Sequence, residues 1–246
     1  MALEDNMNRF SELLQVIDPK SSEFLSAYFR NAPYYILDSM QIVKKDKNTV
    51  FIEEGTNADT IYVLVEGVAR GVDYRIRGVA YDYMWFRSVK IFGSMEVFFN
   101  LNKYKTTLMT VTPCTMLVLS RKNFERWIWD DKNALKMDVE QTGEFLLEQN
   151  LSGRLFLFLQ GMDRIIYMFV KYYEQERPTG DFIYVETSRQ ELAERSGFSV
   201  KTVNRAIKKM EEDGFIGRSG RKIVITTKQY KLMKEYLEPI IDQPIA

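Results

Sequence analysis

The sequence contains no histidine and a single cysteine, Cys114, among its 246 residues. Without histidine the chain cannot form a Ser-His-Asp triad or a Cys-His nucleophile pair, and most soft-metal sites are excluded as well. One cysteine cannot form an internal disulfide, which suits a reducing compartment. Because Cys114 lies in the apolar run 111–118, we interpret it as a buried strand residue. These absences argue against an enzyme, and we expect neither a metal nor a cofactor.

The sequence also lacks an excess of either charge and any long apolar run. Its 34 Lys and Arg residues cancel 34 Asp and Glu residues, so a surface for nucleic acid must arise from local clustering. The acidic N-terminus, 1–5, leads into no apolar run of the signal-peptide type. The most apolar stretch, 155–170, is interrupted at 160–164 and is too short and too charged to cross a bilayer. We therefore expect a cytoplasmic protein with no membrane partner.

Changes in hydrophobic periodicity divide the chain. Residues from about 9 to 35 have helical spacing, with a stop at Asp18-Pro19. From 41 to 119 the period falls to two, and turn signals recur at short intervals, which predicts many short strands in a β-sandwich or barrel. The pattern is helical again from 122 to about 176, where one long helix or two in sequence are expected. The predicted fold class is therefore α+β.

We predict a sensor domain over 1–121, a long helix over 122–160 and a DNA-binding domain over 161–246. The boundary is expected between Phe158 and Asp163, where Gln160-Gly161 would form a hinge because glycine weakens a helix. Periodicity leaves two interpretations of the long helix open, packing on its own domain or a coiled coil between two copies. The heptad positions of the second interpretation are Leu135, Val139, Thr142, Leu146, Gln149, Gly153 and Phe156.

The last third of the chain has the order of a winged helix-turn-helix. Thr187 and Gln190 have the spacing of a capping box, so we expect a helix to start at Thr187. Gly197 can adopt the positive φ of a tight turn, and Ser199 can cap the second helix. A basic turn at 217–222, followed by an apolar strand, has the outline of a wing.

The second helix of this motif has an apolar face for the core and a polar face for a DNA major groove. Between Thr187 and Lys234 twelve Lys and Arg residues accompany five Asp and Glu residues, a local excess that phosphate binding requires. Arg205 is the first choice for paired hydrogen bonds to guanine. The alternative is a solvated helical hairpin with a basic face. The candidate DNA-binding residues are Arg189, Ser199, Val200, Lys201, Thr202, Asn204, Arg205, Lys208, Arg218 and Arg221.

Several motifs in order resemble those of the cyclic-AMP receptor protein and fumarate-nitrate regulator (CRP/FNR) family. Residues 50–55 and 61–67 are similar to its opening strand pair, residues 91–98 resemble its phosphate-binding cassette, and the long helix resembles its dimer helix. The resemblance implies a jelly-roll β-barrel sensor domain and a homodimer that regulates transcription. It implies binding to double-stranded DNA at a pseudo-palindromic operator, and contact with RNA polymerase is a further expectation from the family.

The chain departs from that family at three informative positions. Ser94 and Lys105 stand where cyclic-nucleotide binders have a Glu for the ribose and an Arg for the cyclic phosphate, so cyclic AMP is not the expected ligand. Lys201 replaces a Glu that reads cytosine, which predicts a different base preference, whereas Arg205 matches the guanine-reading Arg. The residue inventory also excludes the iron–sulfur cluster and the histidine-ligated haem of other members.

We expect a small organic anion to bind between barrel and long helix, with Lys105 neutralising its charge and aromatic faces covering its body. Two alternatives stay open, an effector-independent regulator with a degenerate sensor domain and an enzyme with a cupin-like β-domain, for which the lack of histidine leaves little room. The candidate effector-binding residues are Tyr74, Tyr83, Trp85, Phe92, Gly93, Ser94, Lys105, Thr106, Gln149 and Asn150.

Overall fold

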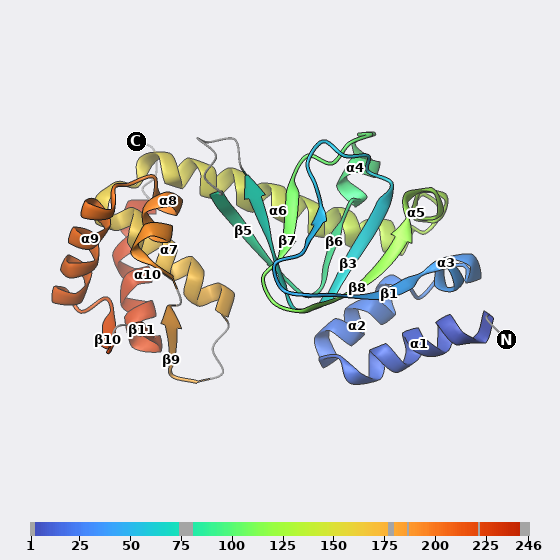
Figure 1. Cartoon of the computed structure of the whole chain (residues 1–246), viewed down its shortest axis with the longest axis horizontal. Helices are drawn as coiled ribbons and strands as arrows, with labels where there is room; N and C mark the ends of the chain where they lie inside the picture. The colour runs from blue at the N-terminus through green and yellow to red at the C-terminus, as the bar shows by residue number, and fades with distance from the viewer. Residues whose placement is uncertain (1–2, 74–80, 177–179, 186, 221, 242–246) are drawn as a thin grey trace. The chain divides into compact units, whose positions relative to one another are not determined.

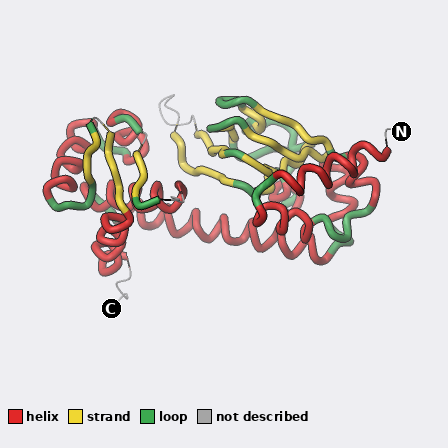
Figure 2. Tube along the Cα trace, turned by 90° about the horizontal axis from the view of Figure 1, so that it is seen from below, coloured by secondary structure: helices red, strands yellow, loops and turns green. Residues whose placement is uncertain are grey.

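The computed structural model describes residues 3–73, 81–176, 180–185, 187–220 and 222–241. They form two compact units, Met1–Leu147 and Glu148–Ala246. The first unit combines two four-stranded sheets with helices, and the second combines helices with a three-stranded sheet (Figures 1 and 2). The predicted α+β class is confirmed. Of the helices in these ranges, none is both long enough and apolar enough to span a bilayer.

Three helices precede the first sheet. They are α1 (Leu3–Val16), α2 (Pro19–Tyr28) and α3 (Tyr34–Ser39). The predicted stop at Asp18-Pro19 also starts α2, because the Asp18 carboxylate accepts the N–H groups of Lys20 and Ser21, both at 3.1 Å. Pro19 at the first helical position loses no hydrogen bond there.

The strands predicted between 41 and 119 are present and form a two-sheet sandwich of the jelly-roll type. One sheet has the order β1 (Gln41–Lys45), β8 (Cys114–Ser120), β3 (Thr60–Glu66) and β6 (Lys90–Phe92). The other has the order β2 (Val50–Ile52), β7 (Thr107–Thr110), β4 (Val68–Asp73) and β5 (Tyr81–Arg87). All these pairings are antiparallel.

Alternation along β3 supplies two hydrophobic clusters. Ile61 and Val63 belong to the cluster that includes the N-terminal helices, whereas Leu64 belongs to the cluster between the two sheets. Cys114 lies in the second cluster and is buried, as predicted. Gly67 is required at the turn between β3 and β4, because its φ is 96° and an added Cβ would lie 2.5 Å from the Pro113 carbonyl oxygen.

The helical region that we expected at 122–160 contains two helices instead of one. They are α5 (Arg121–Ile128) and α6 (Lys132–Phe158), and a short helix α4 (Ser94–Phe98) precedes them within the sandwich. Asp131 separates them, because its carboxylate accepts the N–H groups of Asn133 and Ala134, both at 3.1 Å, and the Trp127 indole N–H at 3.0 Å. The long helix therefore begins at residue 132.

The second unit begins earlier than the boundary that we predicted at 158–163. Leu159, directly after α6, is buried in the second unit's core, and the division between the units falls after Leu147. Helix α7 (Gly161–Glu176) starts after a two-residue interruption, where Gly161 has a φ of 54°. The interruption lies where Gln160-Gly161 predicted it.

The second unit continues with the elements of a winged helix-turn-helix. They are β9 (Phe182–Val185), α8 (Arg189–Ser196), α9 (Val200–Glu212), β10 (Gly217–Ser219), β11 (Lys222–Thr226) and α10 (Thr227–Ile241). The strands form one antiparallel sheet in the order β10, β11, β9. In the hydrophobic core of this unit, α7, α9 and α10 pack together through Phe169, Ile207 and Met233, each at most 1% exposed.

Candidate nucleic-acid interface and effector cavity

Helix α8 begins with a capping box one residue later than predicted. The Ser188 hydroxyl accepts the Glu191 N–H at 3.1 Å, and the Glu191 carboxylate accepts the Ser188 N–H at 2.7 Å. The predicted pair, Thr187 and Gln190, is therefore wrong. A Ser-x-x-Glu pair satisfies the two backbone donors better than the Thr-x-x-Gln pair, because a carboxylate forms charge-assisted hydrogen bonds. Thr187 instead donates its hydroxyl hydrogen bond to the same carboxylate at 3.1 Å.

The turn between α8 and α9 has the predicted glycine and cap. Gly197 has a φ of 70°, and the Ser199 hydroxyl accepts the Thr202 N–H at 3.1 Å. The role of Arg164 on α7 was not predicted. Its guanidinium donates to the Ser196 carbonyl at 2.9 Å and lies 4.8 Å from the centre of the Phe198 ring. Arg164 thereby fixes the turn to α7. A cation so far away in the sequence has no local signature.

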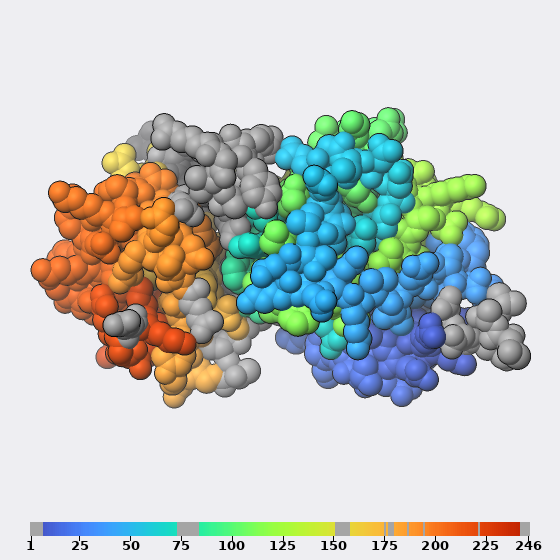
Figure 3. Space-filling model, viewed as in Figure 1, coloured from blue at the N-terminus to red at the C-terminus, as the bar shows by residue number. Residues whose placement is uncertain are grey.

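Helix α9 has the two faces that its spacing predicted. Its inner residues, Val203, Ala206, Ile207 and Met210, are all buried. The outer residues Val200, Lys201, Asn204, Arg205 and Lys208 are exposed. In Figures 1 and 3 α9 (orange) lies at the surface of its unit. These five outer residues are therefore not covered by the protein's own interior and are accessible to a DNA groove.

The cations of α9 differ in their ion pairs. Lys208 lies 3.8 Å from Glu212, and Lys209 lies 2.7 Å from Asp213. Within the ranges that the structure describes, neither Lys201 nor Arg205 is in an ion pair. The positive charges of Lys201 and Arg205, in the N-terminal half of α9, are thus not paired with a carboxylate of the described residues.

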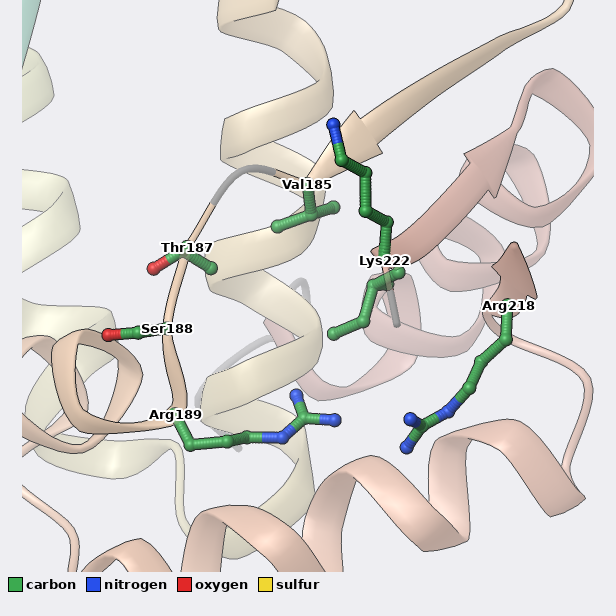
Figure 4. Close-up of a pocket in the computed structure, with 7 residues that line it drawn as sticks. Val185, Thr187, Ser188, Arg189, Arg218 and Lys222 are labelled. Atoms are coloured by element: carbon green, nitrogen blue, oxygen red, sulfur yellow. The ribbon is translucent and has the colours of Figure 1, made fainter. Parts of the chain in front are cut away.

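Two further candidates, Arg189 and Arg218, lie in one pocket of about 570 Å³ beside the wing (Figure 4). Arg189 comes from the start of α8 and Arg218 from β10. Burial, and then the charge of Arg218, lower the pKa of the Arg189 guanidinium. Arg221 lies outside the described residues.

In the first unit, a cavity of about 240 Å³ lies beside the predicted cassette. Five of the candidate effector residues line it, namely Phe92, Gly93, Ser94, Lys105 and Thr106. Sequence reasoning missed Phe86, Lys90, Glu96, Tyr104, Thr142 and Phe145, which line it as well. Thr142 was assigned to a dimer seam, because a heptad pattern does not distinguish a partner helix from a domain's own cavity.

None of the other effector candidates whose side chains the structure describes lines this cavity. Trp85 is on β5, opposite Arg70, and does not line this cavity. Gln149 and Asn150 follow the division between the two units. Tyr74 lies outside the described residues, and of Tyr83 only the backbone in β5 is described.

A buried carboxylate lies beneath this cavity. Asp138 of α6 is 1% exposed and accepts hydrogen bonds from the Ser94 hydroxyl at 2.8 Å and the Tyr28 hydroxyl at 2.9 Å. Burial raises its pKa to about 6, although both hydrogen bonds and the charge of Lys90 act in the opposite direction. Ser94 is thus engaged within the protein, and one carboxylate joins α2, α4 and α6.

One turn further along α6, Gln141 holds the strand that precedes the cassette. Its side chain accepts the Ile91 N–H and donates to the Val89 carbonyl, both at 3.0 Å. The Lys90 ammonium donates to the Gln141 carbonyl at 3.1 Å and lies 5.5 Å from the centre of the Phe145 ring. The cavity wall formed by β6 and α4 is therefore hydrogen-bonded directly to α6.

Comparisons with known proteins agree with this architecture. Residues 42–131 match the family described as the cyclic nucleotide-binding domain, and residues 154–233 match the Crp-like helix-turn-helix domain. The cAMP-activated global transcriptional regulator CRP of Haemophilus influenzae is 22% identical over 193 residues, which are 78% of this chain and 86% of that relative.

Solved structures have the same fold. The c-di-GMP responsive global regulator CLP of Xanthomonas campestris has a TM-score of 0.66 at 20% identity, covering 85% of this chain and 99% of its own. FixK2 of Bradyrhizobium japonicum has a TM-score of 0.63 at 16% identity, covering 84% of this chain and 99% of its own.

The two matched regions together span more than half of the chain and define a DNA-binding transcription regulator with a cyclic-nucleotide-binding-type domain. The solved structures share this fold over most of the chain. The chain belongs to the CRP/FNR family, as its motifs indicated.

The buried carboxylate predicts a pH effect on stability. Since the pKa of Asp138 rises from 3.8 to about 6 on folding, the folded state holds this proton more tightly between those pH values. Unfolding free energy should therefore fall as the pH rises through that window, by up to about 3 kcal/mol from this group. Asp138→Asn should remove this component, measured by urea unfolding from pH 4 to 7.5.

Asp130→Asn is the control, because Asp130 is an exposed carboxylate close to the start of the same helix. Its pH profile should match that of the wild type. Identical profiles for the wild type and Asp138→Asn would show that this carboxylate does not take up a proton on folding.

Proposed function

We propose that the protein binds a pseudo-palindromic operator as a homodimer and is controlled by a small-molecule effector other than cyclic AMP. Each α9 would enter the major groove, with the two helices about 34 Å apart, as the repeat of the DNA requires. The observation that carries this proposal is the orientation of α9. Its apolar face is buried and its polar, cationic face is exposed. Contact with RNA polymerase belongs to the same proposal.

Base readout is assigned to the N-terminal half of α9. Arg205 can form two parallel hydrogen bonds to guanine, and Asn204 and Lys201 can reach bases or phosphates. Lys201 can only donate hydrogen bonds, so we expect an acceptor-bearing base at that position of the half-site. Arg189, Arg218 and the capped helix starts would position the protein on the backbone.

Dimerisation is assigned to the exposed apolar residues of α6. Val139 is 49% exposed, Leu146 41% and Leu147 74%, and side chains of this kind favour a partner surface over water. Leu135, the first position of the predicted seam, packs against the core of its own unit. Of Gly153 and Phe156 only the backbone, within α6, is described. One face of α6 thus packs on its own unit, and we assign a second, exposed face to the contact between two copies.

Effector binding is assigned to the 240 Å³ cavity, where Lys90 and Lys105 meet aromatic rings. These residues suit a small organic anion with an apolar body. Ser94 cannot offer a ribose the charge-assisted acceptor of a carboxylate, and its hydroxyl donor is already used on Asp138. The relatives also differ in ligand, since one is named as cAMP-activated and another as c-di-GMP responsive.

The second candidate is an effector-independent regulator. The observation that favours it is the closed hydrogen-bond set of Ser94, Asp138 and Tyr28, which requires no ligand for completion. In that case the abundance of the protein alone would set operator occupancy.

Arg205 provides the test of sequence-specific binding. Arg205→Lys keeps the charge and loses the planar fork, so affinity for the operator should fall by about 1–3 kcal/mol with little change on random duplex. Arg205→Ala should lose the same discrimination. The measurement is fluorescence anisotropy, with an operator selected from a random pool. Equal losses on every sequence would exclude base readout by Arg205.

Val139 provides the test of the dimer. Val139→Glu should weaken self-association by at least about 2 kcal/mol, because a carboxylate would be buried without a partner. Sedimentation velocity over a concentration series measures the change. Lys136→Glu adds a carboxylate at an exposed position of the same helix that is not one of the seam positions, and it should leave the dimer intact. A monomeric wild type, or equal effects of both variants, would refute this seam.

Lys105 provides the test of the effector. A library of small organic anions should contain a compound that raises the unfolding temperature of the wild type and changes its operator affinity. Lys105→Gln should weaken that effect about tenfold in ligand concentration, whereas Lys103→Gln, outside the cavity, should not. Operator binding that no compound alters would instead favour the effector-independent regulator.

A further inference from the structure

Three charged side chains come together beside the wing, namely Arg189 of α8, Arg218 of β10 and Glu211 of α9. Figure 4 shows the guanidinium groups of Arg189 and Arg218 pointing toward one another across the pocket, while the Lys222 ammonium points away from both. Lys222 lies instead 5.3 Å from the centre of the Tyr184 ring. Glu211, in the last turn of α9, accepts a hydrogen bond from the Arg218 Nε at 2.6 Å. A carboxylate thus already occupies one side of a two-arginine site.

The electrostatics of this site favour an anion. Arg218 destabilises the charged form of Arg189, whereas Glu211 stabilises it, so the carboxylate acts on both guanidinium groups. Among the described residues Arg189 itself has no ion-pair partner. Two guanidinium groups at one pocket provide the planar, paired donors that bind phosphate well. The single negative charge of Glu211 can therefore neutralise only one of the two positive charges, those of Arg189 and Arg218.

We propose that Arg189 and Arg218 together hold one backbone phosphate of duplex DNA, and that Glu211 competes with this phosphate for Arg218. This inference rests on the proposed function and adds a regulating residue to it. Glu211 is an internal substitute for the phosphate in the free protein. DNA binding then has to break or share the pair between Glu211 and Arg218, so Glu211 limits affinity for every duplex sequence alike.

The location of Glu211 explains why it can have this role. It lies on the same helix as Arg205, in the last turn and two residues before the C-cap Asp213. Its side chain is 27% exposed and that of Arg218 is 47% exposed, so solvent and a DNA strand can reach the pair. A partly exposed ion pair contributes little stability, and its exchange for a phosphate is therefore inexpensive.

The test is the affinity of Glu211→Gln for duplex DNA. The variant keeps the shape of the side chain and releases Arg218, so binding to random duplex should strengthen roughly three- to tenfold at low salt. The slope of log affinity against log salt should steepen by about one phosphate contact. Operator affinity should rise by the same factor. Fluorescence anisotropy over a salt series measures all three quantities.

Asp213→Asn is the matched control. It removes the same charge two residues later, from a carboxylate paired with Lys209 instead of Arg218. A general electrostatic effect of lost negative charge would appear in both variants. The proposal requires a clearly larger gain for Glu211→Gln, and thermal unfolding of both variants checks that each is folded.

A double-mutant cycle decides whether Glu211 acts through Arg218. In an Arg218→Ala background, the gain in DNA affinity from Glu211→Gln should fall to about that of Asp213→Asn. An equal gain in both backgrounds would overturn the proposal while leaving DNA binding intact. Failure of the wild type to bind duplex DNA would instead overturn the proposed function. If Glu211→Gln gained affinity for inorganic phosphate and not for DNA, the site would serve a free phosphorylated ligand, and our assignment would be wrong.

Discussion

Burial of one face of α9 is the constraint on which the DNA-binding unit depends. Val203, Ile207 and Met210 are at most 1% exposed in the core shared with α7 and α10. A helix has a fixed angular relation between its faces, so this packing leaves Lys201 and Arg205 outside. The turn before α9 is fixed independently by Gly197, Ser199 and Arg164. Function at the surface is therefore a consequence of apolar packing inside.

In the first unit, hydrogen bonds hold the long helix to the wall of the cavity. Asp138 and Gln141 on α6 are hydrogen-bonded to the cavity wall formed by β6 and α4. A ligand that displaces Ser94, or that attracts Lys90 away from Gln141, would change how α6 is held. The effector that we propose would therefore act on α6 through these contacts.

Electrostatics in this chain are local. The whole chain has no net charge, yet the helix-turn-helix and wing carry a large excess of cations. Several of these cations are already compensated, since Arg218 pairs with Glu211 and Lys209 with Asp213. Counting charges along the sequence therefore overstates the field that DNA would meet. The distribution of free and paired cations depends on which side chains the fold brings together.

The sequence by itself determined the order of elements, the strand region, the turn glycine and the two faces of α9, because each depends on residues a few positions apart. We predicted one capping box a residue early, because Thr187 and Ser188 are both good N-cap residues. We also joined α5 to α6, because the cap formed by Asp131 was not recognised. Sequence reasoning could not find Arg164, Asp138 or the pair of Glu211 with Arg218. Those contacts join residues far apart in the chain, so only tertiary packing decides them. The lining of the cavity also depends on tertiary packing, because strands of the sandwich and one face of α6 enclose it together.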